Sequence, residues 1–310
     1  SKEMVALETL CLLNAWVGKQ HGKMVLDALA KWKIEPKNVD MIASHGQTIY
    51  HAPKSLHPNS EYDPATLQIG DGDHIAVTTG ILTLSDFRQK HIAAGGEGAP
   101  LAVYGDYLLC NHPTENRLLL NMGGIANFTY LSAGCSLDQV FSTDTGTGNT
   151  LMDAYTRAYF APLAYDKDGA IADAGKINAA ILHELKAHSF FTLDLPKTIG
   201  PELFNLEFLE KAQKASHTAE LSPEDVMATL NRFSAETIAD CIQSSIPAGT
   251  KFNMYSSGGG MHNPVLMGHL TSLLPDATLY SSDILSIKTP NPVLISSVSF
   301  TFCSTIESIC

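Results

Sequence analysis

The spacing of apolar and polar residues predicts helices and strands in the first third of the chain. Leu10, Leu13 and Val17 recur at helical spacing, which predicts a helix over residues 4–33 that Pro36 ends. Short apolar runs predict strands over residues 39–43, 66–69 and 81–88, with a helix over residues 73–79 ended by glycine. Polar residues follow the first strand directly, as they do at the ligand-binding edge of an open α/β sheet.

The middle of the chain is organised around two glycine turns. Residues 118–131 are apolar on both sides of Gly123 and Gly124, which predicts two strands joined by a hairpin whose glycines adopt positive φ. A further strand is predicted to end at Asp144, and a helix to begin near Asn149. The glycines between them and the unpaired N–H groups of a helix start form a surface that an anion can approach.

A third glycine turn is expected near the end of the chain. Ser222 and the acidic residues after it predict a helix start, and this helix runs to about Ile242. A strand over residues 252–257 then leads into three consecutive glycines and a helix start. Bare backbone of this kind suits a flat base or a ribose. Residues 280–310 are rich in serine, threonine and β-branched residues.

Composition narrows the function classes. The chain has 310 residues, 45% hydrophobic and 17% charged, which predicts a large core and two domains. A net charge of -12 argues against nucleic acid or an anionic membrane as a partner. No apolar run is long enough to cross a bilayer, the start does not resemble a secretory signal, and the six cysteines are scattered. These features predict a cytoplasmic protein with free thiols and no metal centre.

Asp144 is the main candidate for chemistry. It stands beside the predicted anion site, where a carboxylate facing a phosphate is unfavourable unless a cation or a transferred proton compensates. This combination suggests phosphoryl transfer with Asp144 as a base or a magnesium partner. The alternative is a helix-capping or Asx-turn residue, and the local sequence leaves both open. His45, after the first strand, is likewise either a ligand contact or a buried core imidazole. The chain contains no P-loop, dinucleotide-binding or hydrolase-elbow motif.

Together these motifs closely resemble those of the anhydro-N-acetylmuramic acid kinases of the actin/hexokinase/Hsp70-like superfamily. The matching segments, in order, are residues 44–48, 66–71, 86–88, 93–101, 120–127, 144–149 and 258–264. The resemblance implies an α/β fold of two actin-like (ribonuclease H-like) domains with a cleft between them, the first incomplete. It places residues 1–93 and 294–310 in the first domain and residues 94–293 in the second.

The implied reaction uses ATP and Mg²⁺. Water opens the 1,6-anhydro ring of anhydro-N-acetylmuramic acid, a small amino sugar, and O6 is phosphorylated in cell-wall recycling. The resemblance assigns Asp144 as the catalytic base and allows a homodimer. It assigns cofactor binding to Gly123, Gly124, Asn127, Gly146, Gly148, Asn149, Gly258, Gly259, Gly260 and Asn263. It assigns substrate binding to His45, Gln47, Arg88, Gly96, Gly98, Ala99 and Pro100.

The sequence departs from the family pattern at several points. The first phosphate loop of the family, Gly-x-Met-Ser-Gly-Thr-Ser-x-Asp-Gly, is not found, and residues 293–300 replace a helix whose glutamate helps to bind the sugar. His91, Glu97 and Pro201 stand where aspartate, glutamine and arginine are usual. These departures leave a competing interpretation, a non-catalytic sugar- or nucleotide-binding remnant of the family. An ATP-independent glycosidase would need a second carboxylate that the sequence does not offer.

Overall fold

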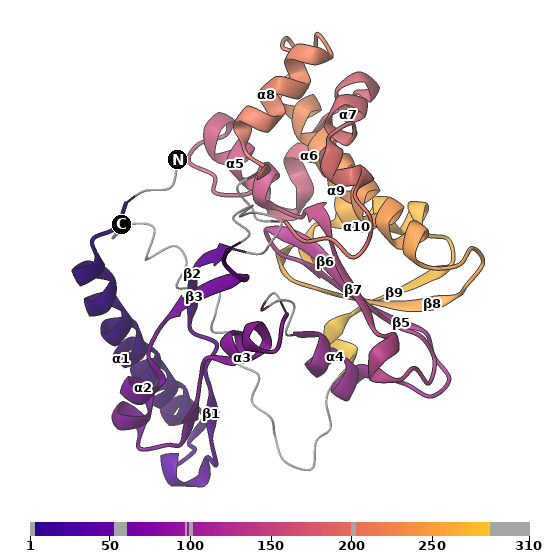
Figure 1. Ribbon diagram of the computed structural model, residues 1–310. Helices are drawn as coiled ribbons and strands as arrows, with labels where there is room; N and C mark the ends of the chain where they lie inside the picture. Colours follow the sequence, from indigo (N-terminus) through magenta and orange to yellow (C-terminus); the bar gives the residue numbers. More distant parts are fainter. Residues whose placement is uncertain (1–3, 53–60, 97, 99–101, 200–202, 286–310) are drawn as a thin grey trace. The chain divides into compact units, whose positions relative to one another are not determined.

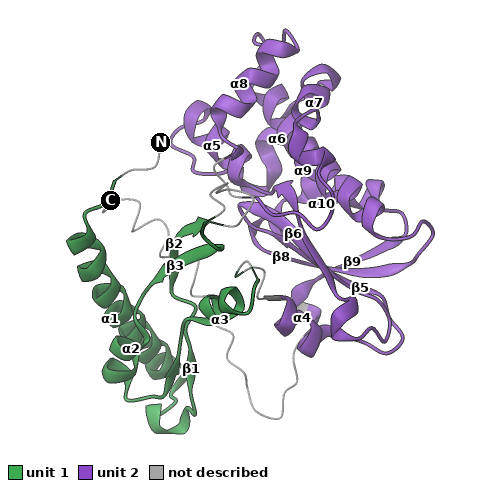
Figure 2. Ribbon diagram, in the orientation of Figure 1, with its two compact units in different colours: residues 1–101 green, residues 102–310 purple. Residues whose placement is uncertain are grey.

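The computed structural model describes residues 4–52, 61–96, 98, 102–199 and 203–285. The chain forms two compact units, residues 1–101 and residues 102–310 (Figure 2). The domain boundary proposed from the sequence, after residue 93, stays a prediction, and the segment 294–310 assigned to the first domain lies outside the described residues. Each unit is described by itself.

The first unit combines a long helix with short strands (Figure 1). Its elements are α1 (Leu7–Trp32), η1 (Pro36–Asn38), β1 (Ile42–Ala43), β2 (Gln47–Ala52), β3 (Ala65–Ile69), α2 (Gly72–Thr79), β4 (Thr83–Leu84) and α3 (Phe87–Ala93). β1 pairs with β4 in parallel, and β2 pairs with β3 in antiparallel. The predicted first helix and the strand over residues 66–69 are confirmed, as is the helix ended by Gly80.

Two glycines bring α1 close to α2 and to the chain before it. A Cβ on Gly18 would lie 2.6 Å from the carbonyl oxygen of Asp71, and one on Gly22 would lie 2.7 Å from the Thr78 side chain. The helices pack closely because these positions, one turn apart, carry no side chain. Val17 of α1 and Ile75 of α2 are fully buried.

The predicted strand over residues 81–88 is wrong. Only Thr83–Leu84 is extended, and Arg88 lies in the helix α3. Asp86 adopts a left-handed conformation with φ 61°, which interrupts the extended run and starts the helix. The strand predicted over residues 39–43 is likewise reduced to Ile42–Ala43, because β4 offers a partner of only two residues.

The second unit is built on a five-stranded mixed sheet. Its strands are β5 (Arg117–Met122), β6 (Ile125–Leu131), β7 (Phe141–Thr147), β8 (Phe252–Ser257) and β9 (Ala277–Ser281). Its helices are α4 (Ala102–Cys110), α5 (Thr150–Tyr159), α6 (Ala170–Ala174), α7 (Ala179–Lys186), α8 (Leu206–Ala215), α9 (Pro223–Ser245) and α10 (Pro264–Leu273). Short 3₁₀ turns are η2 (Leu137–Gln139), η3 (Lys167–Gly169), η4 (Ser189–Thr192), η6 (Gly259–His262) and η7 (Ser282–Leu285).

The order of the strands across this sheet is β7-β6-β5-β8-β9. β6 is antiparallel to both of its neighbours, whereas β5, β8 and β9 are parallel to one another. The strands β5, β6 and β7 form an antiparallel meander, and β8 and β9 extend the sheet in parallel on the other side of β5. This arrangement is the sheet of a ribonuclease H-like, actin-like domain. The predicted α/β fold class is therefore confirmed.

Helices cover both faces of the sheet. Leu118, Leu120 and Met122 alternate along β5 and are completely buried against α9 and α10. On the opposite face, Leu119 packs with Leu131 and with Cys110 at the end of α4. A second core, rich in phenylalanine, lies among α5, α6, α7, α8 and the first half of α9 (Figure 1).

The described residues contain no helix that is long and apolar enough to cross a membrane. Cys11 is an exposed free thiol, and Cys110, Cys135 and Cys241 are buried free thiols. The predicted free thiols are confirmed for these four positions, while Cys303 and Cys310 lie outside the described residues.

Candidate functional site

The first two glycine turns meet in the second unit. The hairpin predicted at Gly123 and Gly124 joins β5 to β6, and its carbonyl groups face the turn that leads from β7 into α5. The backbone N–H of Gly148 donates to Gly124 at 2.8 Å, and that of Asn149 donates to Gly123 at 2.9 Å. Thr150 also donates its N–H to Gly124, at 3.1 Å.

These contacts correct two expectations. Neither Gly123 nor Gly124 has a positive φ, so the hairpin needs glycine for close approach and not for a left-handed turn. A Cβ on Gly124 would lie 2.7 Å from the Thr150 hydroxyl, and one on Gly148 would collide with the Gly123 carbonyl. The N–H of Thr150, the first residue of α5, and the two N–H groups before it bond to the hairpin and are therefore not left for an anion.

The third glycine turn packs against the end of β5. Gly258 has φ 81°, and a Cβ there would lie 2.7 Å from the Met122 carbonyl oxygen. A Cβ on Gly260 would lie 2.7 Å from the Met122 side chain. The Asn149 amide donates to the Met122 carbonyl at 3.1 Å and ties the second turn to the same point. The three glycine turns of the sequence thus gather around one strand end.

Asp144 lies on β7, three residues before the strand ends. The prediction that the strand stops at Asp144 is wrong, since β7 continues to Thr147 and α5 begins at Thr150. One carboxylate oxygen, Oδ2, accepts the backbone N–H of Ile199 at 2.8 Å. The side chain does not cap α5, whose N-cap is Asn149, and the assignment of Asp144 as a base stays a prediction. Burial raises its pKa to about 6, and the Ile199 hydrogen bond opposes that rise.

Two further asparagines of the predicted cofactor set have defined places. Asn127 stands opposite Asp144 in the β6–β7 register. Asn263 is buried, and its side-chain oxygen accepts the N–H groups of Val265 and Leu266 at the start of α10. Its amide is therefore a helix cap, and its assignment to a cofactor stays a prediction. The assignment to a cofactor also stays a prediction for Gly146, which adopts φ 147° within β7, and for Gly259 in η6.

Sequence reasoning missed two charged residues of this unit. Asp153 lies in the first turn of α5, and burial raises the pKa of its carboxyl to about 6. Lys197 is only 9% exposed, and its backbone lies along β7 beside Asp144. The proline-bounded, polar stretch around Lys197 was the signal that could have found it. The signal for Asp153 was its place one turn after the glycine turn.

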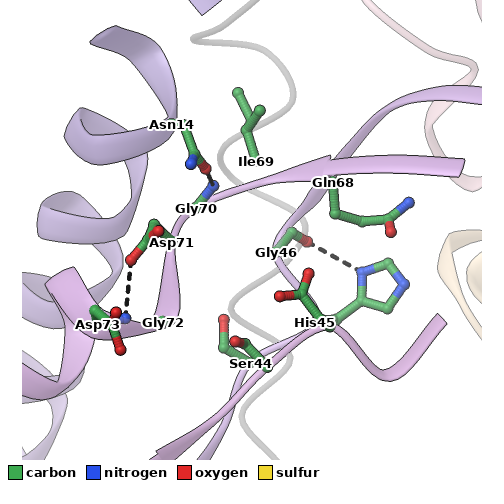
Figure 3. Close-up of a pocket in the computed structure, with 12 residues that line it drawn as sticks. Asn14, Ser44, His45, Gly46, Gln68, Ile69, Gly70, Asp71, Gly72 and Asp73 are labelled. Carbon is green, nitrogen blue, oxygen red and sulfur yellow. Dashed lines mark hydrogen bonds between the residues drawn. The ribbon is translucent and has the colours of Figure 1, made fainter. Parts of the chain in front are cut away.

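The first unit holds a polar cavity of about 190 Å³. It is lined by Asn14, Ser44, His45, Gly46, Gln68, Ile69, Gly70, Asp71, Gly72, Asp73, Ser85 and Asp86. Figure 3 shows the His45 ring, whose Nδ1 lies 3.0 Å from the Gly46 carbonyl oxygen, and the Asn14 side chain, which accepts the Gly70 N–H. His45 is exposed, so it is not the buried core imidazole considered above.

Arg88 is buried and orders a different part of the first unit. Its Nε donates to the Gly98 carbonyl at 2.7 Å, and its guanidinium also donates to the Thr48 hydroxyl at 3.0 Å. Burial lowers the pKa of the guanidinium. His91 holds the same loop, because its Nδ1 accepts the Gly98 N–H at 3.0 Å. Arg88 does not line the cavity that contains His45.

Of the remaining predicted substrate residues, the structure describes Gln47 and Gly96. Gln47 begins β2, and its amide lies 3.5 Å from the Thr48 carbonyl oxygen. A Cβ on Gly96 would collide with the His91 ring, which would have to move. Ala99 and Pro100 lie outside the described residues. The described residues contain no group of three or more metal-ligating side chains.

The strand order and the acidic residue beside three glycine turns define the class, an α/β protein with an actin-like sheet. Residues 2–304 match the family described as anhydro-N-acetylmuramic acid kinase. A relative of that name from Pseudoalteromonas atlantica is 58% identical over 278 residues, covering 90% of this chain and 69% of its own length. Another from Pasteurella multocida is 40% identical over 269 residues, covering 87% of this chain and 68% of its own length. The chain belongs to the anhydro-N-acetylmuramic acid kinase family.

Proposed function

We propose that this protein is an ATP-dependent kinase that opens the 1,6-anhydro ring of anhydro-N-acetylmuramic acid and phosphorylates O6, as a step of cell-wall recycling. Membership of the family gives the reaction. The observation that carries the proposal is Asp144, a carboxylate with a pKa of about 6 on the strand that leads into the glycine turns. Such a carboxylate is ionised at neutral pH and is a stronger base than an ordinary aspartate.

The proposed chemistry needs one base and one acceptor. Asp144 takes a proton from a water molecule as the water oxygen bonds to the anomeric carbon and the bond from that carbon to O6 breaks. O6 then bonds to the γ-phosphorus as the bond from phosphorus to the ADP oxygen breaks. The products are N-acetylmuramic acid 6-phosphate, ADP and the proton held by Asp144.

The nucleotide is assigned to the second unit. Gly124 is exposed, so the outer side of the hairpin leaves backbone that phosphates can approach. A hollow of about 520 Å³ is lined by Asp168, Ala170, Asp173, Pro264, Val265, Gly268 and His269. Its two aspartates disfavour phosphate and suit an uncharged base and ribose. The hollow borders the first two turns of α10, the helix that follows the third glycine turn.

The sugar is assigned to the first unit. His45 and Gln47 supply polar groups, and Arg88 shapes the loop at Gly98 by donating to its carbonyl. Mg²⁺ belongs to the proposal as the companion of ATP, because it is bound by one or two carboxylates together with substrate phosphates. A carboxylate such as Asp144 or Asp153 fits that requirement. A cytoplasmic location and a homodimer are part of the same proposal.

Turnover with and without the sugar tests this function. With ATP, Mg²⁺ and anhydro-N-acetylmuramic acid, we expect ADP release and a product heavier than the sugar by one water and one phosphate. Activity should fall below pH 6, because protonated Asp144 cannot act as a base. Asp144→Asn should abolish turnover, whereas Asp138→Asn, an exposed carboxylate on η2, should not.

The competing interpretation predicts a different result. A non-catalytic remnant would release no ADP above background, while calorimetry would still detect the sugar or the nucleotide. Absence of both turnover and binding would contradict the kinase and the remnant together.

A further inference from the structure

Residues 197–199 run alongside β7 and bond to Asp144 through both its backbone and its carboxylate. β7 is an edge strand of the sheet, so its outer backbone groups need partners from elsewhere. The N–H of Asp144 donates to the Lys197 carbonyl at 2.9 Å, and the N–H of Lys197 donates to the Thr143 hydroxyl at 3.0 Å. Two residues on, the Ile199 N–H donates to the Asp144 carboxylate.

The Lys197 side chain anchors this segment to the phenylalanine core. Its Nζ donates to the Phe190 carbonyl at 3.0 Å and lies 4.5 Å from the centre of the Phe190 ring. The Phe191 ring is 5.8 Å away. Both rings contact Phe204, which is completely buried. The buried ammonium is therefore satisfied by a carbonyl and by aromatic faces, and no described carboxylate forms an ion pair with it.

We infer that Lys197 is a positioning residue for Asp144: its anchored side chain fixes the segment whose Ile199 amide orients the carboxylate. Asp144 Oδ2 is the oxygen that accepts the Ile199 N–H. Nothing in the resemblance or in the family match assigns Lys197 a role. The inference rests on the proposed function only for its catalytic consequence.

The charge on Lys197 matters because the anchor depends on it. A neutral side chain of similar length would fill the space but would lose the hydrogen bond and the attraction to the rings. The segment could then shift along the edge of β7. Cys241 on α9 is a titratable group close enough to act on both Lys197 and Asp144, and burial raises its thiol pKa to about 11, so it is neutral at the working pH.

Lys197→Met is the central variant. We expect kcat to fall about 100-fold, as for a catalytic group displaced by about 1 Å, while KM for both substrates stays within about twofold. The acid limb of the plot of kcat against pH should move to higher pH. A weaker Ile199 hydrogen bond stabilises the ionised carboxylate less, so the pKa of Asp144 rises. Lys214→Met, an exposed lysine on α8, is the matched control and should leave both unchanged.

A second variant and a second measurement separate this inference from the proposed function. Ile199→Pro removes the N–H donor itself and should shift the same limb in the same direction, whereas Ile199→Val should not. NMR titration of the Asp144 carboxyl carbon reports its pKa even in a chain that turns over no substrate. A higher Asp144 pKa in Lys197→Met, with an unchanged thermal midpoint, supports the inference. An unchanged Asp144 pKa in Lys197→Met would overturn it, whether or not Ile199→Pro shifts that pKa.

Discussion

At the scale of single residues, the site depends on keeping a carboxylate where water is scarce. Asp144 accepts the backbone N–H of Ile199, and burial outweighs that hydrogen bond, so its pKa rises from 3.8 to about 6. Ionising this carboxyl therefore costs more free energy in the folded protein than in the unfolded chain, so ionisation lowers the free energy of unfolding. Keeping a buried base ionised reduces the stability of the fold, which is common at catalytic positions.

Asp144→Asn should stabilise the protein at pH 8. The raised pKa means that the penalty is absent below about pH 4, grows as pH rises through 6 and is constant above. Two pKa units correspond to a gain of about 3 kcal/mol at most in the free energy of unfolding. Urea denaturation at pH 8 and pH 4 measures it. A gain of equal size at both pH values would contradict this account.

At the scale of elements, the turns are held together by missing side chains. The β5–β6 hairpin and the β7–α5 turn can exchange hydrogen bonds because Gly124 and Gly148 carry no Cβ. The turn before η6 reaches Met122 for the same reason. Three segments that are far apart in sequence therefore share one strand end.

Gly148→Ala should separate the first two turns. Its Cβ would collide with a backbone carbonyl, which cannot rotate away, so we expect a loss of about 1–3 kcal/mol in stability and reduced ATP binding. Gly105→Ala on α4 is the control. No atom lies within 4 Å of a Cβ there, and replacing a helical glycine should raise stability slightly. Denaturation and calorimetry with ATP compare the two variants, and wild-type behaviour of Gly148→Ala would refute the close-approach argument.

Gly268→Leu should test the hollow beside α10. The new side chain has open space around its Cβ and projects from a residue that lines the hollow, so it should fill the site without disturbing the fold. We expect KM for ATP to rise about tenfold, equivalent to about 1.4 kcal/mol of lost binding, with the thermal midpoint unchanged or higher. The same change at Gly105 should leave KM alone. An unaltered KM for ATP in Gly268→Leu would contradict the assignment of the nucleoside to this hollow.

At the scale of the whole molecule, the chain separates into two units with their own interiors. The second unit contains the five-stranded sheet, both large cores and all three glycine turns. The first unit contains the polar cavity and Arg88. The residues assigned to the nucleotide and those assigned to the sugar thus belong to different units.

Residues 102–310 alone should fold and bind ATP. Among the described residues, the buried cores of this unit contain none of residues 1–101, so removing residues 1–101 takes no side chain out of these cores. We expect a cooperative thermal transition and ATP binding by calorimetry, with no binding of the sugar. A fragment that unfolds without cooperativity would contradict the division into units.

Much of the fold and part of the site could be predicted from the sequence. The first helix, the glycine hairpin and the strand before Gly258 follow from local patterns, because periodicity and glycine pairs act over a few residues. Residues 81–88 were mispredicted because a strand forms only where a partner strand is available, and β4 has just two paired residues. Asp153 and Lys197 were missed because burial of a charge cannot be seen locally.

The sequence by itself determined the α/β class, the family and the identity of Asp144 as the residue most suited to chemistry, since these rest on residue types and their order. Only the tertiary structure decided that the N–H groups of residues 148–150 bond to the hairpin, that the glycines serve close approach, and that the Ile199 N–H donates to the Asp144 carboxylate. The physical reason is that hydrogen-bond partners and desolvation depend on segments brought together from distant parts of the chain, which no local pattern encodes.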